Sequence, residues 1–268
     1  QIVSVATPDF AHTEPALRMI EAGKHVLIEK PMTTSAKEGR QILEARDRMG
    51  IKLMVNFHNR WYPPIAEAKR RLESGELGDP VAMYARLSDR IEVATEWLPW
   101  ASSSGPEWFL LPHVVDLVRW LSGGQRVRRV FALGARGVLE SMGIHCYDAV
   151  QAQINFERTF ATVESAWIVP KGWRSIIDFQ LQIVGEGGKI DIIGDQENIK
   201  VASDKFSTPF VLDPITEEEP IKHFIECVIR DEEPKCTGED GLEVTRIIEN
   251  IINSVMKGNV VQMGKELL

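Results

Sequence analysis

The sequence predicts an α/β part followed by an α+β part: a partial parallel sheet in residues 1–57, then a large, mainly antiparallel open sheet covered by helices in residues 58–268. Three observations predict this. Short, nearly continuous apolar runs alternate with helical patterns up to residue 57, which is typical of a parallel sheet buried on both faces. Strand patterns joined by tight turns dominate after residue 125. Two amphipathic helical patterns follow near the end of the chain.

The first part alternates strands and helices. Its three strands are predicted at residues 2–6, 25–29 and 51–57. Thr13 can cap the first helix, which Gly23 ends. Ser35 and Glu38 form a capping box for the second helix, which Gly50 ends. Parallel strands of this kind are connected by right-handed crossovers, and ligands gather at their carboxyl ends.

A cation follows the second predicted strand. The motif Glu29-Lys30-Pro31 stands where that strand ends and the chain turns toward a crevice. Because the residue before a proline is held extended, the direction of the Lys30 side chain is fixed. One interpretation of this pattern is therefore a preorganised ammonium. The alternative is that Lys30 only marks the strand end and is solvated.

The second part begins with a hinge pattern, FHNRWYPP, at residues 57–64. Strands are then predicted at residues 81–87, 126–135, 147–156, 160–169, 175–185 and 189–194, and helices at residues 65–75, 112–122, 218–231 and 242–258. Tight turns join several of these strands, which indicates an antiparallel sheet with one face covered by helices. The glycine cluster at residues 185–188 is interpreted as such a turn, because it precedes a strand and a dinucleotide fingerprint must open a helix.

The composition argues against several classes of protein. A net charge of −8 and a pI of about 5.4 disfavour a nucleic-acid surface, and the basic cluster from Arg126 to Arg129 is too short to make one. No apolar run approaches the ~20 residues of a membrane span, and no signal-peptide pattern opens the chain. Cys146, Cys227 and Cys236 form no CxxC pair and are interpreted as buried thiols in a reducing compartment. We therefore expect a cytoplasmic protein.

A second chemical signal lies in the segment WASSSGPEWFLLPHVVDLVRWLSGG, residues 100–124. His113, Asp116 and Trp120 share one stripe of the predicted helix, beside its apolar core stripe. A histidine at a helix start beside a loop can act as a general acid or base near neutral pH, and Asp116 one turn away can orient its ring. The alternative is a structural histidine hydrogen-bonded to Asp116. No metal site is predicted, because a third ligand is missing.

Five segments in this order resemble the Gfo/Idh/MocA oxidoreductases: VATPDFAH, GKHVLIEKPMT, HNRWYPPI, LGDPV and HVVDLVRWLSG. The EKP motif is the most specific of them, the pattern ATP-x-x-x-H comes second, and the resemblance runs essentially from residue 1 to the end. It implies an N-terminal Rossmann domain that binds NAD or NADP. It also implies a C-terminal domain with a large open sheet, often used for oligomerisation.

By this resemblance, residues 1–57 are the second half of a Rossmann domain, and residues 58–268 are a C-terminal substrate-binding and oligomerisation domain. The first half is then absent from the chain. With it are absent the glycine fingerprint and the residue that selects NAD or NADP at the ribose 2′ position. No G-x-G-x-x-G pattern occurs in the sequence.

The resemblance also implies roles for individual residues. It places Thr7, Pro8 and His12 at the nicotinamide ribose, Glu29 and Lys30 beside nicotinamide and substrate, and Asn56 and Arg60 in the wall of the cleft. His113 and Asp116 match the last two members of the family pattern D-x-G-x-H-x-x-D. Phe109 and Leu111 replace its first Asp and its Gly. If the family chemistry uses that missing carboxylate, this protein must manage with Lys30 and His113 or do something else.

The resulting prediction is an NAD(P)-dependent dehydrogenase that transfers a hydride to or from a CH–OH carbon of a sugar, sugar acid or inositol-like polyol. His113 is expected to take the hydroxyl proton. Lys30, with its pKa lowered by partial burial, is expected to polarise and orient the oxygen. The loop tryptophans are expected either to stack on sugar faces or to lie partly buried under loops. They are Trp97, Trp100, Trp108 and Trp173.

Two other functions stay open. In the first, the chain is a non-catalytic member of the family that forms oligomers or binds a ligand. In the second, it performs NAD-assisted glycosidase chemistry, in which bound NAD oxidises and then re-reduces the sugar. The expected partners are a small polyol or sugar and further copies of the chain, in a dimer or tetramer built through the C-terminal sheet. Neither a nucleic acid nor a membrane is expected as a partner.

Overall fold

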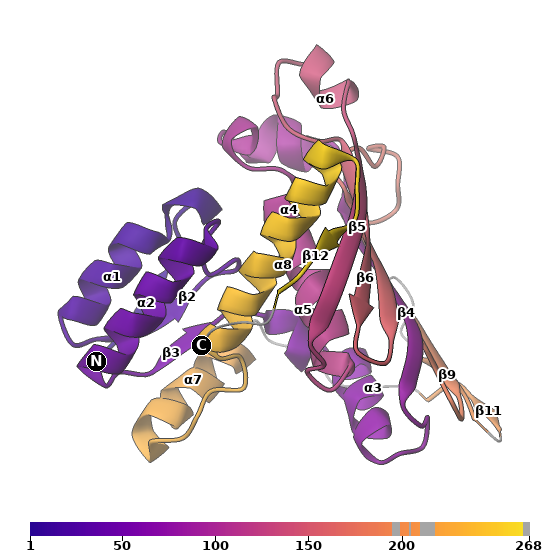
Figure 1. The fold of residues 1–268 in the computed structure, drawn as a ribbon, viewed down its shortest axis with the longest axis horizontal. Helices are drawn as coiled ribbons and strands as arrows, with labels where there is room; N and C mark the ends of the chain where they lie inside the picture. Colours follow the sequence, from indigo (N-terminus) through magenta and orange to yellow (C-terminus); the bar gives the residue numbers. More distant parts are fainter. Residues whose placement is uncertain (195–198, 204, 210–217, 265–268) are drawn as a thin grey trace.

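The computed structural model describes residues 1–194, 199–203, 205–209 and 218–264, and these residues form two sheets. Figure 1 shows the small sheet with its helices on one side and the large sheet on the other. The long helix α8 (Gly238–Lys257) runs between them. The two-part α/β and α+β architecture predicted from the sequence is confirmed.

The small sheet is parallel throughout. Its strands are β1 (Ile2–Val5), β2 (His25–Ile28) and β3 (Leu53–Val55), in that spatial order. The connecting helices are α1 (Thr13–Glu21) and α2 (Ala36–Met49), with a short helical turn η1 (Asp9–Ala11) after β1. All three strands and both helices were predicted within a few residues.

The helix ends confirm Ser35 as the N-cap of α2, but only half of the predicted capping box, because the Glu38 carboxylate binds Thr13 and Thr33 in place of the Ser35 backbone nitrogen. Ser35 Oγ accepts a hydrogen bond from the Glu38 backbone nitrogen at 3.4 Å, and α2 ends at Gly50 with a left-handed φ of 63°. The prediction that Thr13 caps α1 is wrong, because Thr13 is the first helical residue and no side chain caps that end. Its hydroxyl donates instead to Glu38 Oε2 at 2.7 Å, and so it fastens α1 to the start of α2.

The large sheet has nine described strands in the order β11-β10-β9-β8-β4-β7-β6-β5-β12. They are β4 (Pro80–Asp89), β5 (Val127–Ala135), β6 (Ala149–Phe156), β7 (Phe160–Ala166), β8 (Ile177–Gly185), β9 (Lys189–Ile193), β10 (Lys200–Ala202), β11 (Phe206–Ser207) and β12 (Val261–Gln262). Every named pair is antiparallel except β4 with β7, at the centre of the sheet. The predicted glycine turn at residues 185–188 joins β8 to β9.

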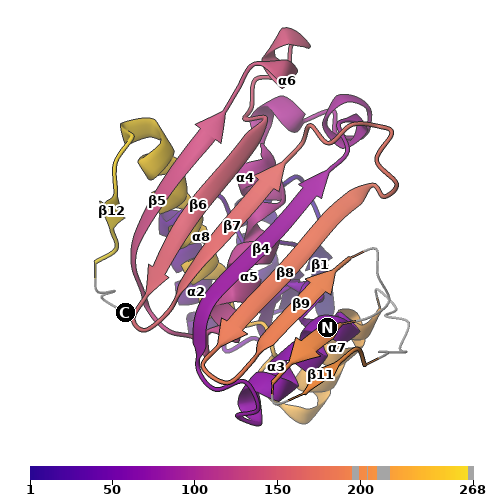
Figure 2. The same cartoon turned by 90° about the vertical axis from the view of Figure 1, so that its right-hand side faces the viewer.

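Helices cover one face of the large sheet and leave the other uncovered, as Figure 2 shows. The remaining helices are α3 (Pro63–Glu73), α4 (Pro106–Phe109), α5 (Leu111–Leu121), α6 (Val138–Ser141) and α7 (Glu219–Arg230), with short turns η2 (His58–Trp61), η3 (Val93–Trp97) and η4 (Ala101–Ser103). The main core lies between the inner face of the sheet and helices α5 and α8.

Helix α8 begins four residues earlier than predicted, because Thr237 and Asp240 form a capping box ahead of the apolar stripe. It also binds the first part of the chain. Thr245 Oγ1 donates to the carbonyl oxygen of Thr33 at 3.0 Å, and the Ala36 backbone nitrogen donates to a carboxylate oxygen of α8. A Cβ at Gly241 would lie 2.6 Å from a Val55 methyl group, so only glycine permits this close contact.

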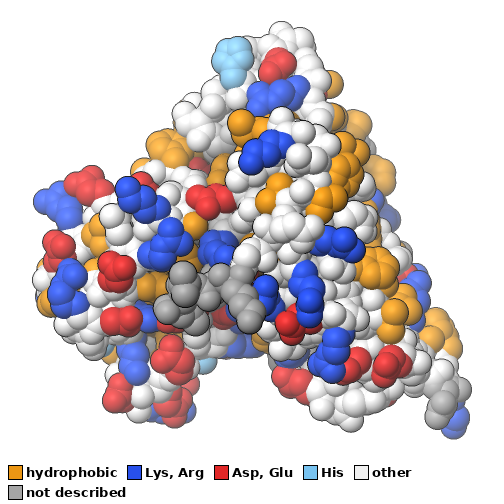
Figure 3. All heavy atoms as spheres, viewed as in Figure 1, with side chains coloured by type: hydrophobic (Ala, Val, Ile, Leu, Met, Phe, Trp, Pro, Cys, Tyr) orange, Lys and Arg blue, Asp and Glu red, His pale blue; other side chains and the backbone are white. Residues whose placement is uncertain are grey.

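The described surface shows no sorting of charge by sign in the view of Figure 3, where Lys and Arg alternate with Asp and Glu over the small sheet and its helices. The three cysteines are free and buried, as predicted. None of the described helices combines the length and the apolar character needed to cross a membrane.

Candidate active site

A cavity of about 600 Å³ opens between the end of β2, the hinge around η2 and the inner face of the large sheet. Its polar lining side chains are Lys30, His58, Asn59, Tyr62, Asp89, His113 and Ser175. The rest of the described wall is apolar apart from Gly194, and it includes Leu87, Trp97, Phe109 and Phe179. A mostly apolar hollow with a few convergent polar groups is typical of a ligand site.

Lys30 enters this cavity from the end of β2. Its Nζ donates a 2.8 Å hydrogen bond to the Phe109 carbonyl oxygen and lies 4.2 Å from the centroid of the Phe109 ring. The residue as a whole is partly exposed, but protein encloses its ammonium end. Burial lowers the pKa of Lys30 to about 8, against the opposing attraction of Glu29, Asp9 and Asp89. Lys30 is therefore mainly protonated at neutral pH.

His113 enters the same cavity from the first turn of α5. Its Nδ1 lies 3.4 Å from Nδ2 of Asn59, and the ring of His58 stands edge-on to it with centroids 4.9 Å apart. Burial, with smaller contributions from Lys30 and His58, lowers the pKa of His113 well below its ordinary value. His113 is therefore a neutral imidazole at physiological pH, able to accept a proton.

Arg60 and Asp116 lie in the protein interior, outside the described lining of the cavity. Arg60 donates from Nε and Nη2 to the Asp116 carboxylate at 2.8 and 2.5 Å, and from Nη1 to Asp240 at 3.1 Å. Although burial alone would lower it, the attraction of Asp116 raises the pKa of Arg60. Burial pulls the pKa of Asp116 upward, against the ion pair, which favours the ionised form.

This geometry corrects two expectations. Asp116 was predicted to orient the His113 ring, but its carboxylate binds Arg60, and Asn59 is the side chain found near His113 Nδ1. Arg60 was predicted to line the cleft, but it is only 2% exposed and joins η2 to α5 and α8. A guanidinium and a carboxylate that leave water stabilise each other best as a bidentate pair, which explains why both point inward.

Asn56 and Glu29 lie at the carboxyl ends of β3 and β2. Asn56 Nδ2 donates to Glu29 Oε1 at 2.6 Å. The other side-chain atom of this amide, Asn56 Oδ1, is buried and has no donor among the described residues. An acceptor left without a donor is costly in a folded chain, so this oxygen is available to a ligand that brings one.

The loop after β1 is held by His12. Its two ring nitrogens lie 2.7 Å from the Pro31 carbonyl oxygen and 2.8 Å from the Thr7 carbonyl oxygen. Through these two contacts His12, which is 1% exposed, connects the loop after β1 to the loop after β2. Thr7 is exposed beside half-buried Pro8, and its hydroxyl donates to the Ala11 carbonyl oxygen at 2.9 Å.

The tryptophans differ in their relation to the cavity. Trp97 lines it and is 55% exposed. Trp173 is 45% exposed but is not part of the described lining, and its carbonyl oxygen accepts a hydrogen bond from Arg90 at 3.2 Å. Trp100 and Trp108 are half-buried and also lie outside that lining.

Sequence reasoning missed Asp89, His58, Asn59 and Tyr62 as residues of the cavity. Asp89 could have been found by extending the strand at residues 81–87, because alternation puts residue 89 on the same face as Leu87. The others lie in the segment FHNRWYPP, where irregular backbone hides which side chains share a direction.

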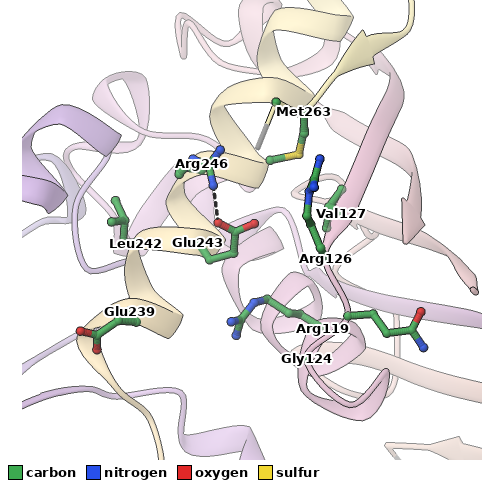
Figure 4. Close-up of a pocket in the computed structure, with 11 residues that line it drawn as sticks. Arg119, Gly124, Arg126, Val127, Glu239, Leu242, Glu243, Arg246 and Met263 are labelled. Atoms are coloured by element: carbon green, nitrogen blue, oxygen red, sulfur yellow. Dashed lines mark hydrogen bonds and ion pairs between the residues drawn. The ribbon is translucent and has the colours of Figure 1, made fainter. Parts of the chain in front are cut away.

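A second hollow, of about 400 Å³, lies between α8 and the turn from α5 into β5. Figure 4 shows its charged lining, in which Arg246 and Glu243 form an ion pair of 2.6 Å. Arg119, at its edge, pairs with Asp240. Within the described ranges no group of three or more His, Cys, Asp or Glu side chains is arranged to hold a metal ion. We therefore take the cavity at Lys30 and His113 as the candidate active site.

Comparison with known protein families finds two matching models that together cover most of the chain. Residues 1–57 match the model described as an oxidoreductase family with an NAD-binding Rossmann fold. Residues 65–191 match the GFO/IDH/MocA C-terminal domain. Both models belong to the same family of oxidoreductases.

Curated relatives and solved structures agree with these matches. The scyllo-inositol 2-dehydrogenase (NAD(+)) of Bacillus subtilis (strain 168) is 26% identical over 275 residues, covering 97% of this chain and 77% of that protein. A scyllo-inositol 2-dehydrogenase (NADP(+)) of the same organism is 33% identical over 126 residues, covering 46% of this chain and 35% of that protein. Levoglucosan dehydrogenase in complex with NADH has the same fold, with a TM-score of 0.88 at 23% identity over 99% of this chain and 80% of that one.

Proposed function

The chain belongs to the Gfo/Idh/MocA family of oxidoreductases, and from this premise we propose that it catalyses hydride transfer between NAD or NADP and a CH–OH carbon of a sugar, sugar acid or inositol-like polyol. The names of these relatives support this class of substrate, since two are scyllo-inositol dehydrogenases and one is a levoglucosan dehydrogenase. The observation that carries the proposal is the meeting of Lys30 and His113 at one cavity.

The two residues divide the handling of the hydroxyl group between them. Lys30, charged at neutral pH, donates a hydrogen bond to the oxygen of the reacting carbinol and stabilises negative charge that develops on it. His113, neutral at the same pH, accepts the hydroxyl proton during oxidation and returns it during reduction. When bound, the nicotinamide ring of the cofactor accepts or supplies the hydride.

The described residues at the carboxyl ends of the small sheet fit the nicotinamide end of such a cofactor. The unpartnered oxygen of Asn56 can accept a hydrogen bond from an amide, and Glu29 holds that side chain in place. Thr7, Pro8 and Lys30 border the same strand ends. Cofactor is therefore proposed to bind across these three strand ends, as ligands do in parallel sheets.

The uncovered face of the large sheet supports self-association of the chain. Leu133, Phe160 and Val184 are exposed there, on the strand faces opposite the buried core. Exposed apolar side chains on an open sheet favour a partner, and a second copy presents the same strands. Light scattering on the purified chain tests this, and Phe160→Lys should shift any dimer or tetramer toward monomer.

Turnover and its pH dependence test the main proposal. Wild-type protein is incubated with NAD or NADP and a panel of inositols and sugars, and reduced cofactor is followed by absorbance. Since Lys30 must carry its proton, kcat/KM for oxidation should fall as the pH rises through about 8. Lys30→Arg keeps the charge and should move this loss to higher pH, whereas Lys30→Met should lower kcat/KM by about 10³-fold. Activity in Lys30→Met equal to wild type would contradict the proposal.

A further inference from the structure

The candidate cavity contains a carboxylate that has no part in the roles proposed for Lys30 and His113. Asp89 is the last residue of β4 and is 4% exposed. It shares the inner face of the sheet with Leu87, whereas Arg86 points to the outer face and pairs there with Asp178. Asp89 is the one carboxylate in the described lining of the cavity.

The surroundings of Asp89 do not satisfy its charge. Among the residues that the structure describes, no side chain completes a hydrogen bond to this carboxylate. The indole N–H of Trp167 faces it and favours its ionised form, yet falls short of hydrogen-bond geometry. Burial dominates and raises the pKa of Asp89 to about 6. Because Asp89 lines the cavity, a ligand bound there can bring the donor that this carboxylate lacks.

Asp89 also faces Lys30. Each of the two groups stabilises the charged form of the other, although they form no direct ion pair within the described residues. The other titratable groups that act on Lys30 are Glu29 from the end of β2, Asp9 from η1 and His113 from α5. Arg90, next in sequence to Asp89, is engaged with Glu92. Lys30 is thus the one charged group of the lining coupled to Asp89.

We propose that Asp89 is a further catalytic residue: its carboxylate accepts a hydrogen bond from a second hydroxyl group of the substrate while Lys30 and His113 act on the first. The inference rests on the proposed function. It makes the site selective for diols and higher polyols over isolated alcohols, because a second hydroxyl group brings Asp89 a donor that an isolated alcohol does not. By staying ionised, Asp89 also favours the ammonium form of Lys30.

The first arm of the test measures the apparent pKa of Lys30 and requires no catalytic activity. The pH dependence of Lys30 acetylation by acetic anhydride is read by peptide mass spectrometry in wild type, Asp89→Asn and Asp178→Asn. Asp178 lies on the neighbouring strand β8 and faces the outer surface, so its variant is a matched control. Asp89→Asn should shift the apparent pKa of Lys30 downward relative to wild type, and Asp178→Asn should leave it unchanged. Equal titration of Lys30 in all three proteins would overturn the coupling.

The second arm of the test measures how substitutions at Asp89 change the preference between two substrates. Wild type, Asp89→Leu and Asp89→Glu are each assayed with scyllo-inositol and with a deoxyinositol that lacks one hydroxyl. Wild type should prefer the inositol by about 10- to 100-fold in kcat/KM, the effect of one hydrogen bond to a charged group. Asp89→Leu should abolish this preference, and Asp89→Glu should restore part of it. A preference retained in a folded Asp89→Leu variant would overturn the proposal.

The two arms also separate this inference from the function on which it rests. If wild type turns over no polyol at all, the proposed function fails, and with it the substrate contact. The Lys30 titration would still decide whether Asp89 and Lys30 are coupled. If wild type is active and both arms are unaffected by changes at Asp89, the function stands and this inference falls.

Discussion

This protein contains two groups of buried ionisable side chains, which differ in how they are paired. In the interior, Arg60 and Arg119 bind Asp116 and Asp240, so each charge has an opposite partner. In the cavity, Lys30, Asp89 and His113 form no such pairs within the described chain, and the pKa values of all three are shifted toward their uncharged forms. Paired charges hold elements together, whereas unpaired ones destabilise the fold and remain available to a ligand.

Removing one member of the paired group should produce the largest effect. Arg60→Met leaves Asp116 buried without its partner, and should lower the free energy of unfolding by about 4 kcal/mol. Urea denaturation measures this. The exposed pair of Arg18 and Glu14 provides the control, since Arg18→Met should change stability by less than about 0.5 kcal/mol. A small loss at Arg60 would erase the contrast between the two groups.

His113 belongs to the unpaired group and should affect rate rather than fold. His113→Gln keeps a polar side chain of similar length but cannot take a proton, so kcat/KM should fall about 100-fold or more. Thermal unfolding should change little, because the ring makes only a long 3.4 Å contact with Asn59 and an edge-on contact with the His58 ring, and forms no ion pair within the described residues. Substantial unfolding of this variant would show that His113 mainly stabilises the fold.

Asp89 tests the difference between paired and unpaired groups, because an unpaired buried carboxylate should destabilise the folded protein when it is ionised. Its pKa is raised from 3.8 to about 6 in the folded protein, so the native state binds the proton more tightly than the unfolded state. Its contribution to stability is therefore present at low pH and is lost as the pH rises through about 6. Asp89→Asn should stabilise the protein by about 2 kcal/mol at pH 7.5 and by much less at pH 4. Chemical denaturation at both pH values measures this, and a stability loss at pH 7.5 would mean that Asp89 is paired after all.

Much of the fold could be predicted because local signals and the packing agree. Ser35 and Gly50 mark both ends of α2 through capping chemistry that depends on a few neighbouring residues. Thr13 carried the same local signal and misled, because its hydroxyl binds Glu38, a partner 25 residues away in sequence. Local patterns predict an element well and its hydrogen-bond partners poorly.

The candidate site was predictable only in part. Lys30 was found because a proline fixes the backbone beside it, and His113 because helical spacing sets its stripe. Asp116 shares that stripe but turns to Arg60, which approaches from the hinge, and no spacing rule reveals a partner on another element. Asp89 needed both the true length of β4 and the knowledge that this strand borders the end of β2.

Helix α8 has a consequence for the integrity of the molecule. It is built from the last part of the chain, yet it is hydrogen-bonded to the loop at Thr33 and to the start of α2, and Cys236 just before it bonds to β3. The small sheet is therefore joined to the rest of the protein by the contacts of α8 as well as by the covalent link through residues 57–64. A protease that cut this segment would release no fragment: the two pieces would elute together from a sizing column, and coexpressed halves of the chain would reassemble as a split protein.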